Sequence, residues 1–156
     1  MNPAKAQAPA NPWIDAARVA ICDIARQAMG MTAQVIGPAD IVEGLAGSII
    51  PIVSNMAPIQ VGLFSNDVGC ELLARALLGS SPHETLTRAE VVDAIGEIVN
   101  MLSGNVKARV ARYATHAALG LPTFVHGPIE TLSQQVVEAV RVKIGMADAY
   151  VVVLHT

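Results

Sequence analysis

Apolar residues recur with a helical period in three parts of this chain and with a period near two in the segments between and after them. The helical spacing predicts three helices, over residues 11–30, 65–79 and 87–113. The shorter period predicts strands over residues 32–36, 48–53, 59–63, 123–126, 140–144 and 149–154. A turn at 145–148 joins the last two strands as a hairpin.

Residues at the predicted helix ends carry capping signals. Asn11 offers an N-cap oxygen, and Pro12 stands in the first turn, where a missing N–H costs nothing. Thr87 and Glu90 form a capping box, which makes the start of the third helix the best-determined boundary in the sequence. Pro51 cannot donate to a ladder of hydrogen bonds, so we expect its strand to lie at an edge or to carry a bulge.

The order of these elements indicates the fold class. Helices and strands come in blocks, and neighbouring strands form hairpins, which is typical of an α+β domain. We therefore expect a mostly antiparallel sheet with long helices packed on one face, as a single domain over residues 11–156. Residues 1–10 are rich in Ala and Pro and lack periodicity, so we expect a disordered tail.

Composition narrows the possible partners. The chain is 53% hydrophobic and only 15% charged, which favours a homo-oligomer that shares apolar surface with a second copy. A net charge of −3 and an aromatic content of 3% provide neither a basic stripe nor a base-stacking platform. We therefore expect no nucleic-acid partner.

Several other classes of protein lack support in the sequence. No apolar run approaches the ~20 residues that span a bilayer, and the N-terminus lacks the apolar core of a signal peptide, so we expect a cytoplasmic protein without a membrane partner. Cys22 and Cys70 each fall within a helical apolar pattern and are interpreted as buried thiols. The four histidines have no paired spacing, so we expect no metal site.

One polar stripe runs along the third predicted helix. At ~100° per residue, Asp93, Asn100 and Gly104 fall within about 60° of Glu97, while the apolar residues of this helix cluster on the opposite side. Gly96 and Gly104 each cost ~1 kcal/mol relative to alanine in a helix interior. Either another molecule approaches the backbone closely at these glycines, or they pack against a neighbouring helix.

The stripe combines groups with complementary chemistry. Glu97 and Asn100 are three positions apart and project side by side, so that a carboxylate could accept from a cation while a carboxamide orients a water. Lys107, about one turn beyond Gly104, could contact an acidic partner surface or could simply be solvated. Taken alone, an exposed Glu/Asn pair is usually solvated helix surface, so the spacing by itself does not establish a function.

The segment 86–122 resembles the CheC/CheX/FliY family of chemotaxis phosphatases, and most closely its CheX branch. The resemblance rests on Asp93-x-x-x-Glu97-x-x-Asn100, on the Met-Leu-Ser-Gly-Asn that follows, and on Pro122, which comes 22 positions after Asn100. It implies an enzyme that hydrolyses the phosphoaspartate of a CheY-type response-regulator receiver domain.

The resemblance also implies roles for individual residues. Glu97 would pair with the active-site lysine of the receiver, and Asn100 would orient the attacking water. Asp93 would be supportive and Pro122 structural. From the helix surface alone, Gly96, Gly104 and Lys107 remain candidate partner contacts. No cofactor of the chain's own is implied, because the receiver supplies Mg²⁺.

The first predicted helix carries Arg26 where a second site would have asparagine, so the resemblance implies one site per chain. Members of the CheX branch are homodimers, so the resemblance also implies a homodimer. Two alternatives stay open. A non-catalytic module of the same fold could bind a receiver or a flagellar-switch component. A small-ligand domain would show a deep enclosed pocket away from the third helix.

Overall fold

The computed structural model describes residues 11–156, and the predicted tail lies outside the described residues. Its helices are α1 (Pro12–Met29), α2 (Asp67–Leu78) and α3 (Arg88–Arg109). Its strands are β1 (Ala33–Pro38), β2 (Ala46–Val53), β3 (Ile59–Ser65), β4 (Ala118–Leu119), β5 (Thr123–His126), β6 (Val136–Ile144) and β7 (Ala147–His155).

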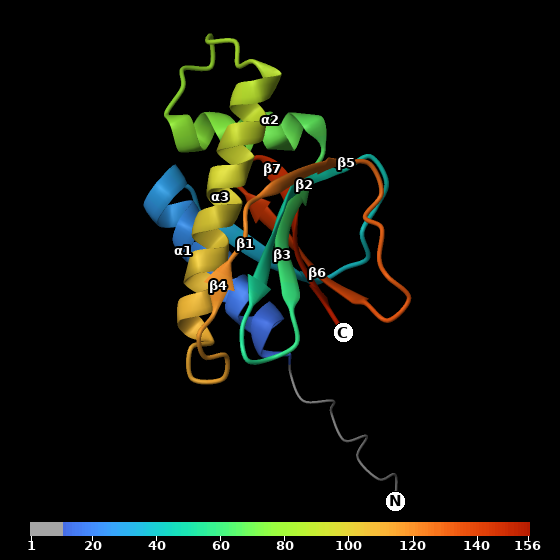
Figure 1. Ribbon diagram of the computed structural model, residues 1–156. Coiled ribbons are helices and arrows are strands. Elements are labelled where there is room, and N and C mark those ends of the chain that lie inside the picture. Colours follow the sequence, from blue (N-terminus) through green and yellow to red (C-terminus); the bar gives the residue numbers. More distant parts are fainter. Residues whose placement is uncertain (1–10) are drawn as a thin grey trace, which may run out of the picture.

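The strands form one sheet in the order β1-β6-β7-β3-β2-β4, with β5 also paired to β2, and every pairing is antiparallel. All three helices pack on one face of this sheet, and α3 contacts both α1 and α2 (Figure 1). The predicted α+β fold, with a mostly antiparallel sheet and helices on one face, is confirmed. No helix in the described part of the chain is long and apolar enough to cross a bilayer.

The apolar residues form two clusters, one on each face of the sheet. The larger cluster fills the space between the helices and the sheet, where β7 contributes Val151 and Val153. The smaller one lies on the face without helices, where the same strand contributes Tyr150 and Val152. Because neighbouring strand residues point to opposite faces, β7 must be apolar at almost every position, which explains its uninterrupted apolar run.

The predicted caps are present. The Asn11 side chain accepts from the backbone N–H of Trp13 at 2.9 Å, and Asn66 caps α2 in the same way by accepting from Gly69 at 2.7 Å. Gly30 and Gly79 end their helices with φ of 61° and 64°, a left-handed conformation that glycine adopts without strain. Local chemistry therefore sets the ends of α1 and the start of α2.

Two boundaries differ from the prediction by four residues each. The third helix ends at Arg109 rather than near Tyr113, because the chain tightens into a turn in which Tyr113 N–H donates to the Val110 carbonyl three residues earlier. Strand β6 begins at Val136, four residues before the predicted start, where its apolar alternation is less regular.

Pro51 shapes the edge of the sheet beside β2. The Pro51 carbonyl accepts from Gly120 N–H at 2.9 Å, so the missing N–H of Pro51 faces the same side, toward the residues between β4 and β5. The neighbouring edge is accordingly interrupted into the short strands β4 and β5. The prediction that the strand of Pro51 lies at an edge or carries a bulge is therefore wrong, because β2 pairs in regular register with β3 on one side and with β4 and β5 on the other. The missing N–H affects the adjoining strand instead.

Candidate functional site

Helix α3 is fixed at its start by the capping box. The Thr87 hydroxyl accepts from Glu90 N–H at 3.1 Å, and the Glu90 carboxylate accepts in return from Thr87 N–H at 3.5 Å. One side of the helix is buried against α1, α2 and β2. The buried residues are Ala94, Ile95, Gly96, Ile98, Val99, Leu102, Ser103 and Val106. This packing holds the rotation of α3 and so decides which side chains face solvent.

The opposite side of α3 carries the predicted polar stripe. Asp93, Glu97 and Asn100 are exposed, and Gly104 and Lys107 are half-exposed. Each of these residues follows the previous one by three or four positions, so they line one face of the helix. Within residues 11–156, no hydrogen bond or ion pair engages the side chains of Asp93, Glu97, Asn100 or Lys107. The stripe is therefore accessible and chemically free to meet another molecule.

Helix α1 differs at the positions where a second site would lie. Asp23 is engaged by Arg26 at 3.2 Å on its own helix and by Arg109 at the end of α3. An acidic side chain held by two guanidinium groups is not free to pair with a cation of another protein. Among the described residues, only α3 presents a free Glu/Asn pair at this spacing.

The two glycines of α3 have different surroundings. Gly96 is buried, and a Cβ added there would lie 3.6 Å from both Cβ and Cγ of Pro122 and 4.0 Å from the Ser48 hydroxyl. At Gly104, a Cβ would meet nothing within 4 Å. The prediction that a partner approaches the backbone therefore has no geometric support at Gly96, which the chain's own Pro122 covers, and it stays a prediction at Gly104.

Pro122 connects the sheet edge to the helix. Pro122 lies in the segment between β4 and β5, immediately before β5. Its side chain covers Gly96, the residue before Glu97. Its neighbour Leu121 is 84% exposed. Sequence reasoning missed Leu121 as a candidate contact, although a large apolar residue between the turn-forming Gly120 and Pro122 was a usable signal.

A groove of about 650 Å³ continues the stripe beyond Asn100. It begins at Gly104 and Lys107 and extends across the turn that follows α3 to Leu119. Four alanines contribute to its lining, namely Ala108, Ala111, Ala114 and Ala117. The groove offers an apolar surface beside the polar stripe, a combination suited to contact with a protein partner.

The remaining reactive groups do not form a catalytic centre of their own. Cys70 is buried, and its burial together with the nearby Asp67 raises the pKa of its thiol to about 11, so it is protonated at neutral pH. Within residues 11–156, no three His, Cys, Asp or Glu side chains gather as metal ligands. Glu97 and Asn100 can bind a cation and orient a water, but neither is a strong nucleophile.

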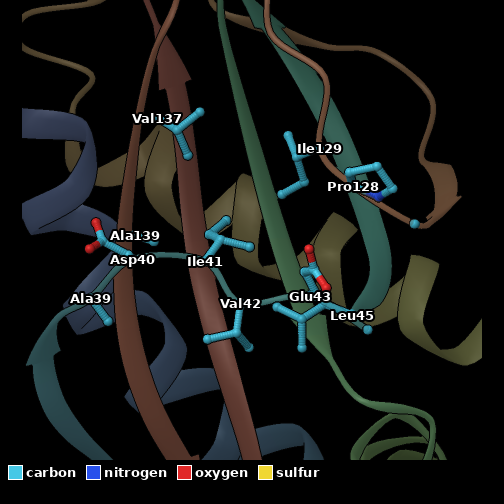
Figure 2. Close-up of a pocket in the computed structure, with 12 residues that line it drawn as sticks. Ala39, Asp40, Ile41, Val42, Glu43, Leu45, Pro128, Ile129, Val137 and Ala139 are labelled. Atoms are coloured by element: carbon cyan, nitrogen blue, oxygen red, sulfur yellow. The ribbon is translucent and has the colours of Figure 1, made fainter.

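A second hollow lies on the opposite face of the sheet, away from α3 (Figure 2). It has a volume of about 610 Å³ and opens to solvent. It lies away from α3, as a small-ligand site would, but it is open to solvent rather than deeply enclosed. It shares no lining residue with the groove at the end of the stripe.

Known proteins resemble this chain in sequence pattern and in fold. The family model described as chemotaxis phosphatase CheX matches residues 47–144, which include the whole stripe and Pro122. No curated protein matches the chain significantly in sequence.

Solved structures share the fold at low identity. A chemotaxis protein CheX from Desulfovibrio desulfuricans is 16% identical, with a TM-score of 0.79 over 94% of this chain and 100% of its own. CheX from Vibrio vulnificus is 17% identical, with a TM-score of 0.76 over 92% of this chain and 98% of its own.

The CheX chain of a CheX–CheY–BeF₃–Mg²⁺ complex from Borrelia burgdorferi is 14% identical, with a TM-score of 0.65 over 92% of this chain and 94% of its own. The fold, the motif on α3 and a family model that spans more than half of the sequence all indicate the same family. The chain belongs to the CheX family of chemotaxis phosphatases.

Proposed function

We propose that this protein hydrolyses the phosphoaspartate of a CheY-type receiver domain, with Glu97 and Asn100 entering the receiver's active site. The observation that carries the proposal is the unpaired, exposed Glu97/Asn100 pair on a helix whose other side is fixed by packing. Membership of the CheX family supports the substrate class, and the named complex of a related CheX with CheY supports the kind of partner.

Glu97 anchors the two proteins in this proposal. Its carboxylate accepts from the receiver's active-site lysine, an interaction that its lack of any partner within the described chain leaves available. Asp93, one turn earlier on the same face, adds negative charge and supports the approach of that lysine. Because both carboxylates are exposed, they act mainly on recognition of the receiver and on its rate of association.

Asn100 supplies the catalytic step. Its carboxamide has both a donor and an acceptor, so it can hold a water in line with the phosphorus–oxygen bond that breaks. The receiver's Mg²⁺ neutralises charge on the phosphoryl oxygens. Water attacks the phosphorus, the receiver aspartate leaves as a carboxylate, and inorganic phosphate is released. Positioning of this kind accounts for a rate increase of about 100-fold or more.

The surroundings of the stripe supply a docking surface in the same proposal. Leu121 precedes Pro122, which covers Gly96, the residue before Glu97, while Gly104 and Lys107 lead into the apolar groove beyond Asn100. These residues would flank the polar pair with apolar contacts that exclude water. Lys107 would meet an acidic side chain of the receiver.

The experiment that tests the proposal follows phosphate loss from an autophosphorylated receiver, with and without the protein. We expect faster decay with the wild-type protein and no acceleration with Glu97→Lys, which places like charges against each other. Glu84→Lys makes the same charge change in the exposed loop before α3 and serves as the control. Complex formation without any change in phosphate lifetime would instead support the non-catalytic module that binds a receiver or a flagellar-switch component.

A homodimer is part of the proposal. The hydrophobic content of 53% supports shared apolar surface, and β1 is an end strand of the sheet, paired with β6 on one side. Its exposed Ile36 would become covered if a second copy added to this edge. Sedimentation equilibrium tests this, because a single species at the mass of one chain would contradict it.

A further inference from the structure

The face of the sheet without helices carries a hollow that has no role in the proposed phosphatase activity. Val137 and Ala139 of β6 form its floor; Ala139 belongs to the smaller apolar cluster with Phe64, Tyr150 and Val152, and Val137 packs against that cluster. The floor is low because Ala139, 8% exposed, stands where a larger side chain would fill the space. The volume of about 610 Å³ is in the range of small-molecule sites, about 300–1,000 Å³.

Two chain segments form the walls, and both are tied to the sheet. One is residues 39–45 between β1 and β2, and the other is residues 127–129 after β5 (Figure 2). Ala39 N–H donates to the Ala139 carbonyl at 3.0 Å, and Gly127 N–H donates to the Leu45 carbonyl at 3.3 Å. Gly127 has a φ of 116°, which favours glycine at this point of the wall. The hollow is therefore defined by backbone contacts as well as by side chains.

The lining has a single sign of charge. Its charged residues are Asp40 and Glu43, and it includes no Lys, Arg or His. Neither carboxylate has an ion-pair partner within residues 11–156. Asp40 also borders a neighbouring hollow that contains Arg18, so Glu43 is the clearer anchor. In Figure 2 the Glu43 carboxylate lies between Leu45 and Ile129.

We infer that this hollow is a binding site for a small molecule that joins an apolar body to a cationic group such as an ammonium. The apolar body lies on Val137 and Ala139 between Ile41 and Ile129, and the cation pairs with Glu43. Placing an anion there would instead oppose it to two carboxylates. The site lies across the sheet from α3, so the inference does not depend on the proposed phosphatase activity.

The test uses two probes of equal chain length and opposite charge, n-octylammonium and octanoate. Each is titrated into the full-length protein while backbone amide shifts are followed by NMR. We expect saturable shifts in residues 39–45 and 127–129 with the amine, and an affinity for octanoate that is about fivefold lower, because an ion pair with the exposed Glu43 is partly screened by water. Glu43→Gln should remove most of the difference in affinity between the two probes. Glu84→Gln makes the same change in net charge on an exposed loop and should leave that difference intact.

Two filling variants test the location. Ala139→Leu raises the floor and Ala39→Phe narrows the rim, and either should abolish binding of both probes while the amide spectrum stays that of a folded protein. Equal affinity for the two probes, shifts confined to other regions, or no saturable binding would overturn the inference. Concentration-dependent shifts of the same amides without a probe would assign this face to a second copy of the chain and would overturn it as well.

Discussion

Replacing Gly96 and Gly104 separately by alanine distinguishes the two roles that a glycine on α3 can have. Both lie in the interior of the helix, where glycine is about 1 kcal/mol less favourable than alanine. At Gly96 the new methyl group would lie 3.6 Å from Pro122, an ordinary van der Waals contact, and at Gly104 it would meet nothing within 4 Å. We therefore expect each variant to gain about 1 kcal/mol in free energy of unfolding.

Urea denaturation measures that gain, and thermal unfolding should show a rise in Tm of about 2–4 °C for a domain of this size. Gly96→Leu is the matched larger variant, because its branched end would extend past the Cβ into Pro122 and should cost stability. A loss of stability in Gly96→Ala would refute the reasoning, since it would mean that Pro122 leaves no room for a methyl group.

Receiver binding then separates the two positions. Gly96→Ala should leave the KM for phosphorylated receiver unchanged, because Pro122 already covers this part of the backbone. Gly104→Ala should raise KM while kcat stays the same, because the methyl group occupies space that a docked partner would use. An unchanged KM in Gly104→Ala would remove the partner-contact role from this glycine without affecting the proposed chemistry at Asn100.

Three further predictions concern other parts of the molecule. Thr87→Ala removes the capping box and should lower the free energy of unfolding by about 1 kcal/mol in urea titrations, whereas a change below a few tenths would contradict the role of the cap. Leu121→Ser should raise the KM for the receiver with no loss of Tm, because the side chain is 84% exposed; an unchanged KM would exclude it from the docking surface. The Cys70 thiol has a pKa of about 11 against an ordinary 9.0, so near pH 8 it holds about 100-fold less thiolate than an unperturbed cysteine. Iodoacetamide should therefore modify Cys70 at least about 100-fold more slowly in the native than in the unfolded protein, as measured by mass spectrometry. Comparable rates in the two states would contradict its burial.

Features set by local chemistry were predictable from the sequence. The caps at Asn11 and Thr87 and the glycine ends of α1 and α2 each depend on residues within one turn, and all are present. The exposed face of α3 followed from helical periodicity alone, because the apolar residues on its other side had to be buried. Periodicity does not distinguish a functional stripe from ordinary solvated surface; only the resemblance to a known family did so.

Features set by contacts between distant segments were not predictable. Pro122 covers Gly96 from the segment between β4 and β5. That segment is held against β2 by the hydrogen bond from Gly120 N–H to the Pro51 carbonyl, a contact between residues far apart in the sequence. The two-residue strand β4 has no periodicity to detect. The hollow beside Glu43 exists because segments 39–45 and 127–129 meet over one face of the sheet, although they lie more than 80 residues apart in the chain.

The most direct measurement of the central claim is the rate of phosphoaspartate hydrolysis by Asn100→Ala at saturating receiver. The account predicts that kcat falls by about 100-fold or more, because the water loses its orienting group. The KM should stay close to that of the wild-type protein, since Glu97 still anchors the receiver. Hydrolysis by Asn100→Ala at the wild-type rate would contradict the account, because the carboxamide could then have no part in the reaction.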